Sequence, residues 1–324
     1  MSGTDSLVAE LTRTRRERPG KIAEVLRRRR RRPLLGPSGR LFLIAADHPA
    51  RGVLRAGRNP LAMADRGEML HRLLIALGRP GVDGVLATPD VVEDLALLGA
   101  LDEKVIFGSM NRGGLAGAVY ELDDRFSSYT AEGIAAACLD GGKMMVRVGD
   151  DDPASARTLV SCAEVISDLA SRGLPAMVEV FASRMKNGRA ENVDDPDALA
   201  RAVQVVSGLG TTSAYTWLKL PVMSEMQRFL RATTLPVVLL GGDPGDRVDA
   251  VYRSWEEAMT HPQVMGLVVG RTLLYPEHGD VARAVDEAAS ILAARPRAQA
   301  ASGASSRSTA RSGDRRRERR RSNE

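Results

Sequence analysis

Residues 143–181 read KMMVRVGDDDPASARTLVSCAEVISDLASRGLPAMVEVF, and this stretch decides the fold. It opens with a β-rich run at Lys143–Val148 and closes with a second at Ala176–Phe181, both dominated by apolar residues. Between them, Ala154–Ser171 has the apolar spacing that is typical of an amphipathic helix. Strand, helix and buried strand in succession predict a βαβ unit, with two parallel strands covered by a helix.

The same alternation continues from Leu41 to Leu292. Eight β-rich runs occur, at Leu41–Ala46, Gly84–Ala87, Val105–Gly108, Lys143–Val148, Ala176–Phe181, Tyr215–Leu220, Pro236–Leu240 and Gly266–Val269. Most are separated by a helix-length amphipathic segment such as Asp197–Gly208. Eight βα units in about 250 residues predict a single (β/α)8 barrel, also called a TIM barrel. An open doubly wound sheet is the alternative, although such sheets usually have fewer strands.

The basic residues lie mostly at the two ends of the chain. The net charge is +5, yet residues 1–33 and 295–324 each carry +7, which leaves −9 on the rest. We therefore expect no nucleic-acid footprint on the folded body. Residues 1–34 are predicted to form a basic helical extension broken near Pro19-Gly20, and residues 35–293 the barrel. Residues 294–324, rich in arginine and serine, are predicted to be a disordered tail.

Composition argues against several other classes of protein. With 44% hydrophobic and 27% charged residues, the chain resembles an ordinary globular protein. No apolar stretch reaches the roughly 18 residues of a membrane span, and the start of the chain has no apolar secretory signal. The two cysteines, Cys138 and Cys162, predict free thiols in a reducing cytoplasm. The four histidines have no metal-ligand spacing, so neither a metal nor a cofactor is expected.

Lys219 stands out because it lies inside the sixth predicted strand, Tyr215–Leu220. In a (β/α)8 barrel the chemistry takes place at the C-terminal ends of the strands. Burial disfavours the charged form of a lysine, and a neutral amine can attack a carbonyl group to form a Schiff base. An ion-paired lysine that closes the top of the barrel is the structural alternative. Position alone does not separate the two.

Three further charged residues occupy similar positions: Asp47 ends the first strand, Lys143 lies in the fourth and Glu179 in the fifth. A carboxylate held in a site of low dielectric constant can move a proton on a substrate hydroxyl or orient a lysine. Lys143 could place a second cation near Lys219, or it could be a structural residue at a strand entrance. Structural ion pairing is expected of at least one carboxylate. His48 is interpreted as a local hydrogen-bonding residue.

Glycines after the last two strands predict a phosphate site. Gly241-Gly242 follows the seventh strand and Gly270-Arg271 follows the eighth, where barrels of this type commonly bind phosphate. Glycines let backbone N–H groups approach phosphate oxygens, and an arginine can add a charged fork. Simple turn geometry is the alternative. Asp243 would repel a phosphate, so we expect it to cap a helix or bind a hydroxyl.

Taken together, these residues resemble the DhnA/LacD-type class I aldolases, which include archaeal-type fructose-bisphosphate aldolase and tagatose-bisphosphate aldolase. The resemblance covers roughly residues 35–293 and rests on Asp47-His48, Lys219, Gly241-Gly242 and Val269-Gly270-Arg271. The segment Lys143–Val148, with Gly149–Pro153 after it, is also similar to the aldolase-like domain attached to some inositol-catabolism kinases. The overall pattern resembles most an actinobacterial group of barrel proteins placed with deoxyribose-phosphate aldolase and LacD and linked to inositol catabolism.

This resemblance implies that Lys219 is the Schiff-base lysine, with Asp47, Lys143 and Glu179 as its polar partners. It also implies a phosphate pocket made of Gly241, Gly242, Gly270 and Arg271. Arg147, in the fourth strand, is a further candidate for substrate or phosphate binding. The eighth strand departs from the pattern: it continues Gly-Arg-Thr rather than the Gly-Arg-Asn of the fructose-bisphosphate branch, so that branch's substrate is not carried over.

The leading hypothesis is reversible aldol cleavage of a phosphorylated keto-sugar or keto-sugar acid, such as 2-deoxy-5-keto-gluconate 6-phosphate, by a homo-oligomer. A second hypothesis is a sugar-phosphate isomerase or epimerase that uses Glu179 and Asp47 in acid–base chemistry. The third is a sugar-phosphate-binding regulator whose arginine-rich ends contact nucleic acid or an acidic partner. Borohydride trapping would separate the first two. Salt-dependent nucleic-acid binding that is lost on deletion of residues 295–324 would identify the third.

Overall fold

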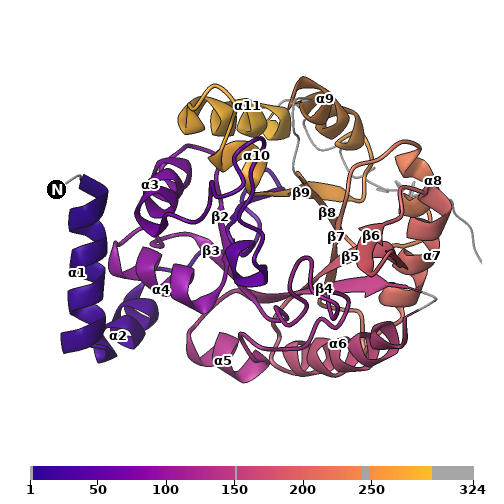
Figure 1. The fold of residues 1–324 in the computed structure, drawn as a ribbon, viewed down its shortest axis with the longest axis horizontal. Coiled ribbons are helices and arrows are strands. Elements are labelled where there is room, and N and C mark those ends of the chain that lie inside the picture. The colour runs from indigo at the N-terminus through magenta and orange to yellow at the C-terminus, as the bar shows by residue number, and fades with distance from the viewer. Residues whose placement is uncertain (1–2, 150–151, 243–247, 294–324) are drawn as a thin grey trace, which may run out of the picture.

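Eight parallel strands close into a barrel in the computed structural model, which describes residues 3–149, 152–242 and 248–293 (Figure 1). The strands are β1 (Leu41–Ala45), β2 (Gly84–Ala87), β3 (Val105–Ser109), β4 (Gly141–Val148), β5 (Ala176–Lys186), β7 (Thr216–Leu220), β8 (Val237–Leu240) and β9 (Val264–Val269). Because β9 pairs with β1 and β4 pairs with β5, the eight strands form a closed ring. The predicted (β/α)8 barrel is therefore confirmed, and the open sheet is excluded.

Helices surround the barrel (Figure 1). They are η1 (Pro49–Arg51), α3 (Arg66–Leu77), α4 (Pro89–Leu97), α5 (Ala131–Ala136), α6 (Pro153–Ser171), α7 (Pro196–Ser207), α8 (Met226–Leu230), α9 (Val248–Ala258), α10 (Arg271–Leu274) and α11 (Val281–Ala293). Both α6 and α7 begin at a proline that follows an aspartate, and the aspartate side chain caps the first turn. Among the described residues, no helix is both long and apolar enough to cross a bilayer.

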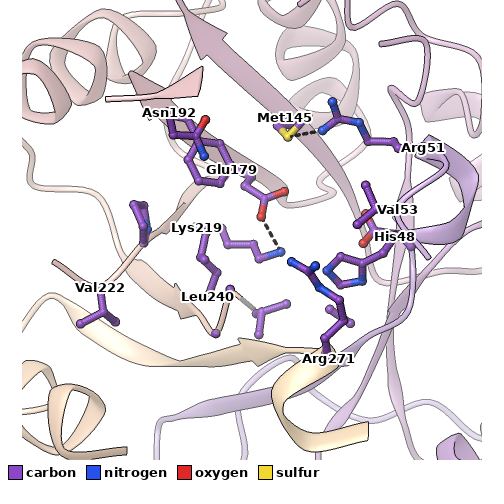
Figure 2. A pocket seen from close by; sticks show the side chains of 18 of the residues that line it. His48, Arg51, Val53, Met145, Glu179, Asn192, Lys219, Val222, Leu240 and Arg271 are labelled. Carbon is purple, nitrogen blue, oxygen red and sulfur yellow. Dashed lines mark hydrogen bonds and ion pairs between the residues drawn. The ribbon is translucent and has the colours of Figure 1, made fainter. Parts of the chain in front are cut away.

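The C-terminal end of β5 carries a hairpin that the sequence patterns above did not predict. β5 runs on to Lys186 and pairs with the antiparallel β6 (Arg189–Asn192). The turn between them is Asn187-Gly188, with positive φ angles of 54° and 74°. Asparagine and glycine are the residues that tolerate this conformation in a two-residue hairpin turn. The hairpin brings Asn192 to the mouth of the barrel (Figure 2).

The N-terminal extension packs against the outside of the barrel. α1 (Gly3–Glu17) lies against α3, and α2 (Gly20–Arg28) lies against α4 (Figure 1). Pro19 separates the two helices, as the sequence predicts, and each helix buries one leucine in the core shared with the barrel. At the other end of the chain, the predicted tail at residues 294–324 lies outside the described residues.

Several arginines of the basic run that follows α2 pair with aspartates at the N-terminal ends of barrel strands. Arg29 and Arg31 contact Asp140, directly before β4, at 2.8 and 2.9 Å. Arg32 contacts Asp83, directly before β2, at 2.5 Å. This face of a barrel serves stability rather than catalysis. These three arginines therefore hold the extension to the barrel, and two aspartates compensate most of their charge within the protein.

Side chains alternate along each strand between the barrel interior and the layer under the helices. In β1, Leu41, Leu43 and Ala45 belong to the interior cluster, whereas Phe42 and Ile44 pack in the outer layer. The interior cluster is apolar throughout. Toward the C-terminal ends of the strands, inward positions carry charge instead. These charged residues are Lys143 and Arg147 of β4, Glu179 of β5 and Lys219 of β7.

Candidate active site

Four charged side chains meet near the C-terminal ends of the strands. Glu179 bridges two lysines: its Oε1 lies 2.8 Å from Nζ of Lys219, and its Oε2 contacts Nζ of Lys143. Nζ of Lys143 also lies 3.2 Å from Oδ2 of Asp47. The register of the sheet places Glu179 directly beside Lys219, since β5 and β7 pair at these residues (Figure 2). The structure therefore brings together the four residues that the sequence singled out as nucleophile and polar partners.

Both carboxylates of this cluster are held as anions. Burial alone would raise the pKa of Glu179, but the charges of Lys143 and Lys219 outweigh burial and hold that pKa well below its usual value. Burial would likewise raise the pKa of Asp47, and the charges of Arg112 and Lys143 again hold it well below its usual value. At neutral pH each carboxylate is thus an anion that accepts hydrogen bonds.

The two lysines differ in their access to the cavity. Lys143 is completely buried, with 0% of its surface exposed, and it does not line the cavity, whereas Lys219 does. Burial and the neighbouring charge of Arg112 lower the pKa of Lys143 to about 8, against the opposing charges of Asp47 and Glu179. Lys143 can therefore exchange a proton with the two carboxylates near neutral pH, although it does not line the cavity itself. Lys219 is the amine that a bound carbonyl compound can reach.

A cavity of about 700 Å³ opens above this cluster. Its size is that of a site for a small metabolite. The residues that follow β8 and β9, Gly241-Gly242 and Gly270-Arg271, line one wall of the cavity. The side chain of Arg271 reaches into the cavity close to Lys219 (Figure 2). The predicted phosphate residues on these two strands thus share one cavity with Lys219.

Packing requires glycine on this wall. A Cβ atom at Gly241 would lie 2.5 Å from Cγ1 of Val269, and one at Gly270 would lie 2.2 Å from the carbonyl oxygen of Ala45. Gly242 adopts a positive φ of 66°, which L side chains rarely adopt. These glycines are therefore explained by the barrel wall itself, whether or not a phosphate binds there. Asp243 lies outside the described residues.

Arg147 occupies the opposite wall. β4 is the fourth strand of the ring, whereas β8 and β9 are the seventh and eighth, directly across it. The guanidinium of Arg147 contacts both carboxylate oxygens of Asp124, at 2.9 and 3.1 Å, and lies 3.4 Å from Glu121. The structure therefore separates Arg147 from the glycine loops and groups it with Arg51 and Arg112, which line the same cavity.

Several polar residues of the site were not among those predicted. Arg112 lies 2.8 Å from Oδ2 of Asp47, and Ser109 donates a hydrogen bond to the same oxygen at 2.9 Å. Asn111 forms two hydrogen bonds with the backbone of Met145, at 2.6 and 2.7 Å, and thereby joins β3 to β4. In the sequence, these residues directly follow the third predicted strand, and that position is the feature by which they could have been predicted. Met145 of β4 also lines the cavity.

His48 lines the cavity beside Arg271 (Figure 2). Burial lowers the pKa of His48 to about 3, despite the opposing charge of Asp47, so the imidazole is neutral at neutral pH. Its Nδ1 makes no hydrogen bond with any residue that the structure describes. This nitrogen therefore does not have the local hydrogen-bonding role that the sequence suggested.

Metal-ligating side chains do not cluster in the described part of the chain. No group of three or more His, Cys, Asp or Glu residues there is arranged to hold a metal ion. Cys138 and Cys162 are both free thiols.

A model of the Cgl0159-like family matches residues 39–289 of the chain. The crystal structure of Cgl0159 from Corynebacterium glutamicum is 49% identical in sequence and superposes with a TM-score of 0.87. That match covers 89% of this chain and 97% of the other. No curated protein matches the sequence.

Archaeal fructose 1,6-bisphosphate aldolases share the barrel. One is 17% identical, with a TM-score of 0.60, and the match covers 85% of this chain and 100% of that one. A second structure of an archaeal aldolase, with the catalytic lysine covalently bound to the carbinolamine intermediate of the substrate, also has 17% identity and a TM-score of 0.60. Here the match covers 84% of this chain and 99% of the other. At this level of identity the likeness establishes a common fold.

Proposed function

The chain belongs to the Cgl0159-like family, and we propose that it is a class I aldolase that cleaves a phosphorylated keto-sugar or keto-sugar acid. One observation carries the proposal: the amine of Lys219 lines a metabolite-sized cavity, and a buried carboxylate, Glu179, holds it at 2.8 Å. A second amine, Lys143, contacts the other oxygen of that carboxylate. Such an arrangement suits a lysine that must lose a proton before it attacks a carbonyl carbon.

In the proposed reaction, Lys219 adds to the substrate carbonyl and forms a carbinolamine, which loses water to give an iminium ion. Glu179 accepts the proton of the substrate's β-hydroxyl while the adjacent C–C bond breaks. The electron pair of that bond moves into the iminium, which becomes an enamine, and the aldehyde product leaves. Protonation of the enamine carbon and hydrolysis then release the second product and the free amine.

Lys143 can take up and release these protons. Its amine, with a pKa of about 8, can hold or release a proton near neutral pH, and it contacts Glu179 and Asp47. Glu179 lies between the two amines, so a proton can pass from Lys219 to Lys143 through its two oxygens. General acid–base catalysis works best when the group that stores the proton has a pKa near the working pH.

For the substrate, 2-deoxy-5-keto-gluconate 6-phosphate is the most specific candidate. Its phosphate would lie on the wall of Gly241, Gly242, Gly270 and Arg271, next to the carbonyl carbon that Lys219 attacks. Cleavage between C3 and C4 would yield dihydroxyacetone phosphate and 3-oxopropanoate. The choice rests on the resemblance to barrel proteins linked to inositol catabolism and on the glycines and the arginine that line the cavity beside the lysine.

Product analysis tests the proposal. The wild-type enzyme is incubated with the keto-acid phosphate, and release of dihydroxyacetone phosphate is followed. Lys219→Met is expected to lose cleavage by at least about 10³-fold, because it has no nucleophile. Lys186→Met, which changes an exposed lysine of the hairpin, is the matched control and should retain activity. A product that is an isomer or epimer, formed equally well by Lys219→Met, would establish the carboxylate-based isomerase in place of the aldolase.

A further inference from the structure

Three arginines, Arg51, Arg112 and Arg147, line the cavity wall that faces the glycine loops. We infer that they form a binding site for a carboxylate at the far end of the substrate, so that the enzyme acts on keto-acid phosphates in preference to simple ketose phosphates. The inference rests on the proposed function and adds to it the residues that recognise the second charged end. Each of the three arginines is at least nine-tenths buried, with 5 to 8% of its surface exposed.

Some N–H groups of these arginines have only weak hydrogen-bond acceptors within the protein. Arg51 donates to the carbonyl oxygen of Gly114 at 2.9 Å, but another of its N–H groups reaches only the thioether sulfur of Met145 (Figure 2). A thioether is a weak acceptor. The carboxylate nearest to Arg51, that of Asp124, lies 3.7 Å away and already accepts two hydrogen bonds from Arg147. Arg51 is therefore a buried cation with a poor partner.

Arg112 also has a donor that the protein leaves unsatisfied. Its Nε is buried and has no hydrogen-bond partner among the residues that the structure describes. A buried N–H group of an arginine that remains unpaired is costly. A carboxylate in the cavity could replace the weak sulfur acceptor of Arg51, since guanidinium groups and carboxylates match in planar geometry.

The charge of the wall favours a carboxylate over a second phosphate. Two carboxylates, those of Asp124 and Glu121, face the three arginines. The third neighbouring carboxylate, Asp47, is shared with Lys143. One positive charge thus remains on the wall, which a singly charged carboxylate balances. A dianionic phosphate would leave an excess negative charge in a buried site, which is unfavourable.

The order of the strands sets the direction of the substrate. Arg112 and Arg147 arise from the third and fourth positions of the ring, whereas the glycine wall arises from the seventh and eighth. Arg51 follows β1, which adjoins β9, but its guanidinium reaches across to Gly114 and Met145 and so joins the arginine wall. Lys219 belongs to the sixth strand and therefore lies nearer the glycine wall. A substrate that spans the cavity would place its ketone close to the phosphate end and its carboxylate several carbons away, toward Arg51 and Arg147.

Three substrates that share a phosphomethyl ketone and the bond to be cleaved test the inference. They are 2-deoxy-5-keto-gluconate 6-phosphate, fructose 1-phosphate and fructose 1,6-bisphosphate, whose far ends are a carboxylate, an alcohol and a phosphate. The wild-type kcat/KM should be highest for the keto-acid phosphate, by about 100-fold over the alcohol, as is typical for a charged partner. A wild-type preference for the bisphosphate, or equal rates with the alcohol, would overturn the inference without using any variant.

Arg51→Gln then locates the recognition. Asp124 keeps its pair with Arg147 in this variant, so no carboxylate is left unpaired. We expect kcat/KM for the keto-acid phosphate to fall by about 10- to 100-fold while that for fructose 1-phosphate changes by less than about threefold. Arg172→Gln, which removes an exposed arginine directly after α6, is the matched control. An equal loss for both substrates would refute a carboxylate site at Arg51.

The outcome separates this inference from the proposed function. If the enzyme cleaves all three substrates through a trappable lysine adduct without regard to the far end, the aldolase is retained and the carboxylate site is wrong. If no adduct forms and no substrate is cleaved, the proposed function itself fails, and the inference falls with it. Arg51→Lys serves as a second variant should Arg51→Gln unfold, and it should lose specificity in the same direction because lysine lacks the planar fork.

Discussion

Replacing Lys143 with methionine should abolish a rise in stability between about pH 8 and pH 10.5. The pKa of this buried amine is lowered from 10.5 to about 8, with burial as the largest cause. Between these two values the unfolded chain keeps a proton that the folded protein has lost. Because the unfolded state binds more protons there, the free energy of unfolding increases with pH across this window. Below pH 8 both states carry the proton, and the cost of burying it is fully present.

The magnitude follows from the size of the shift. One pKa unit corresponds to about 1.4 kcal/mol, so a shift from 10.5 to about 8 is worth about 3 kcal/mol. Methionine approximates the length and volume of lysine without its charge, which keeps the packing of the barrel interior close to that of the wild type. Glu179 and Asp47 stay ionised over the whole window, since their pKa values lie well below it. Their contributions therefore cancel in the comparison.

Urea unfolding, followed by circular dichroism at pH 7.5 and pH 10.5, measures the effect. The quantity of interest is the difference in unfolding free energy between wild type and Lys143→Met, compared at the two pH values. This difference should change by about 3 kcal/mol. For Lys186→Met, whose lysine is exposed on the hairpin, it should not change. Parallel pH profiles for wild type and Lys143→Met would refute the account of a buried amine titrating near pH 8.

Three further predictions concern neighbouring residues. His48 has a pKa of about 3 in the folded protein against 6.5 unfolded, so stability should fall by up to about 5 kcal/mol as the pH drops from 6.5 toward 3. In His48→Asn, the free energy of unfolding measured in urea should fall less steeply between pH 6.5 and pH 3. The same pH dependence as in the wild type would contradict burial of a neutral imidazole. Gly270→Ala places a Cβ 2.2 Å from the carbonyl oxygen of Ala45 and should lower stability by about 1–3 kcal/mol, seen as a reduced Tm; an unchanged Tm would mean that the wall adjusts. Glu179→Gln should reduce kcat by about 10²-fold or more while KM stays similar, and wild-type turnover would remove Glu179 from the mechanism.

The sequence predicts the barrel well because its strands are buried on both faces. Each of the eight parallel strands appears as a short apolar run, and the observed ends differ from the predicted ones by a few residues, except at β5. β5 extends to Lys186 because its C-terminal residues pair with β6 in a hairpin. The sign for that hairpin was present in Asn187-Gly188, a dipeptide that favours a two-residue turn. Its flanking residues are polar, so no apolar alternation accompanied the signal.

The charged centre is predictable for a similar reason. A lysine or glutamate inside an apolar run is conspicuous, and the closure of the barrel then brings Lys143, Glu179 and Lys219 together. Arg51 is not predictable in this way, because it lies outside the strands, in the short helix η1, and its role depends on Asp124, a loop residue far along the chain. The same limit applies to Arg147. Its strand position suggests a site residue, but only the three-dimensional structure reveals which wall it occupies.

The basic run before the first strand illustrates a different limit. From composition alone, the six consecutive arginines indicate a contact with an acidic partner. In the structure, Arg29, Arg31 and Arg32 meet aspartates that precede β2 and β4. Single aspartates in loops carry no pattern that sequence inspection could connect with arginines fifty or a hundred residues away.

The most direct test of the central claim is to locate the covalent adduct. The protein is incubated with 2-deoxy-5-keto-gluconate 6-phosphate or with dihydroxyacetone phosphate, reduced with borohydride and digested, and the modified peptide is identified by mass spectrometry. We expect one adduct per chain, on Lys219, and none in Lys219→Met. An adduct on Lys143 would move the nucleophile to the other amine of the cluster. The absence of any substrate-dependent adduct, while turnover continues, would contradict Schiff-base chemistry in this protein.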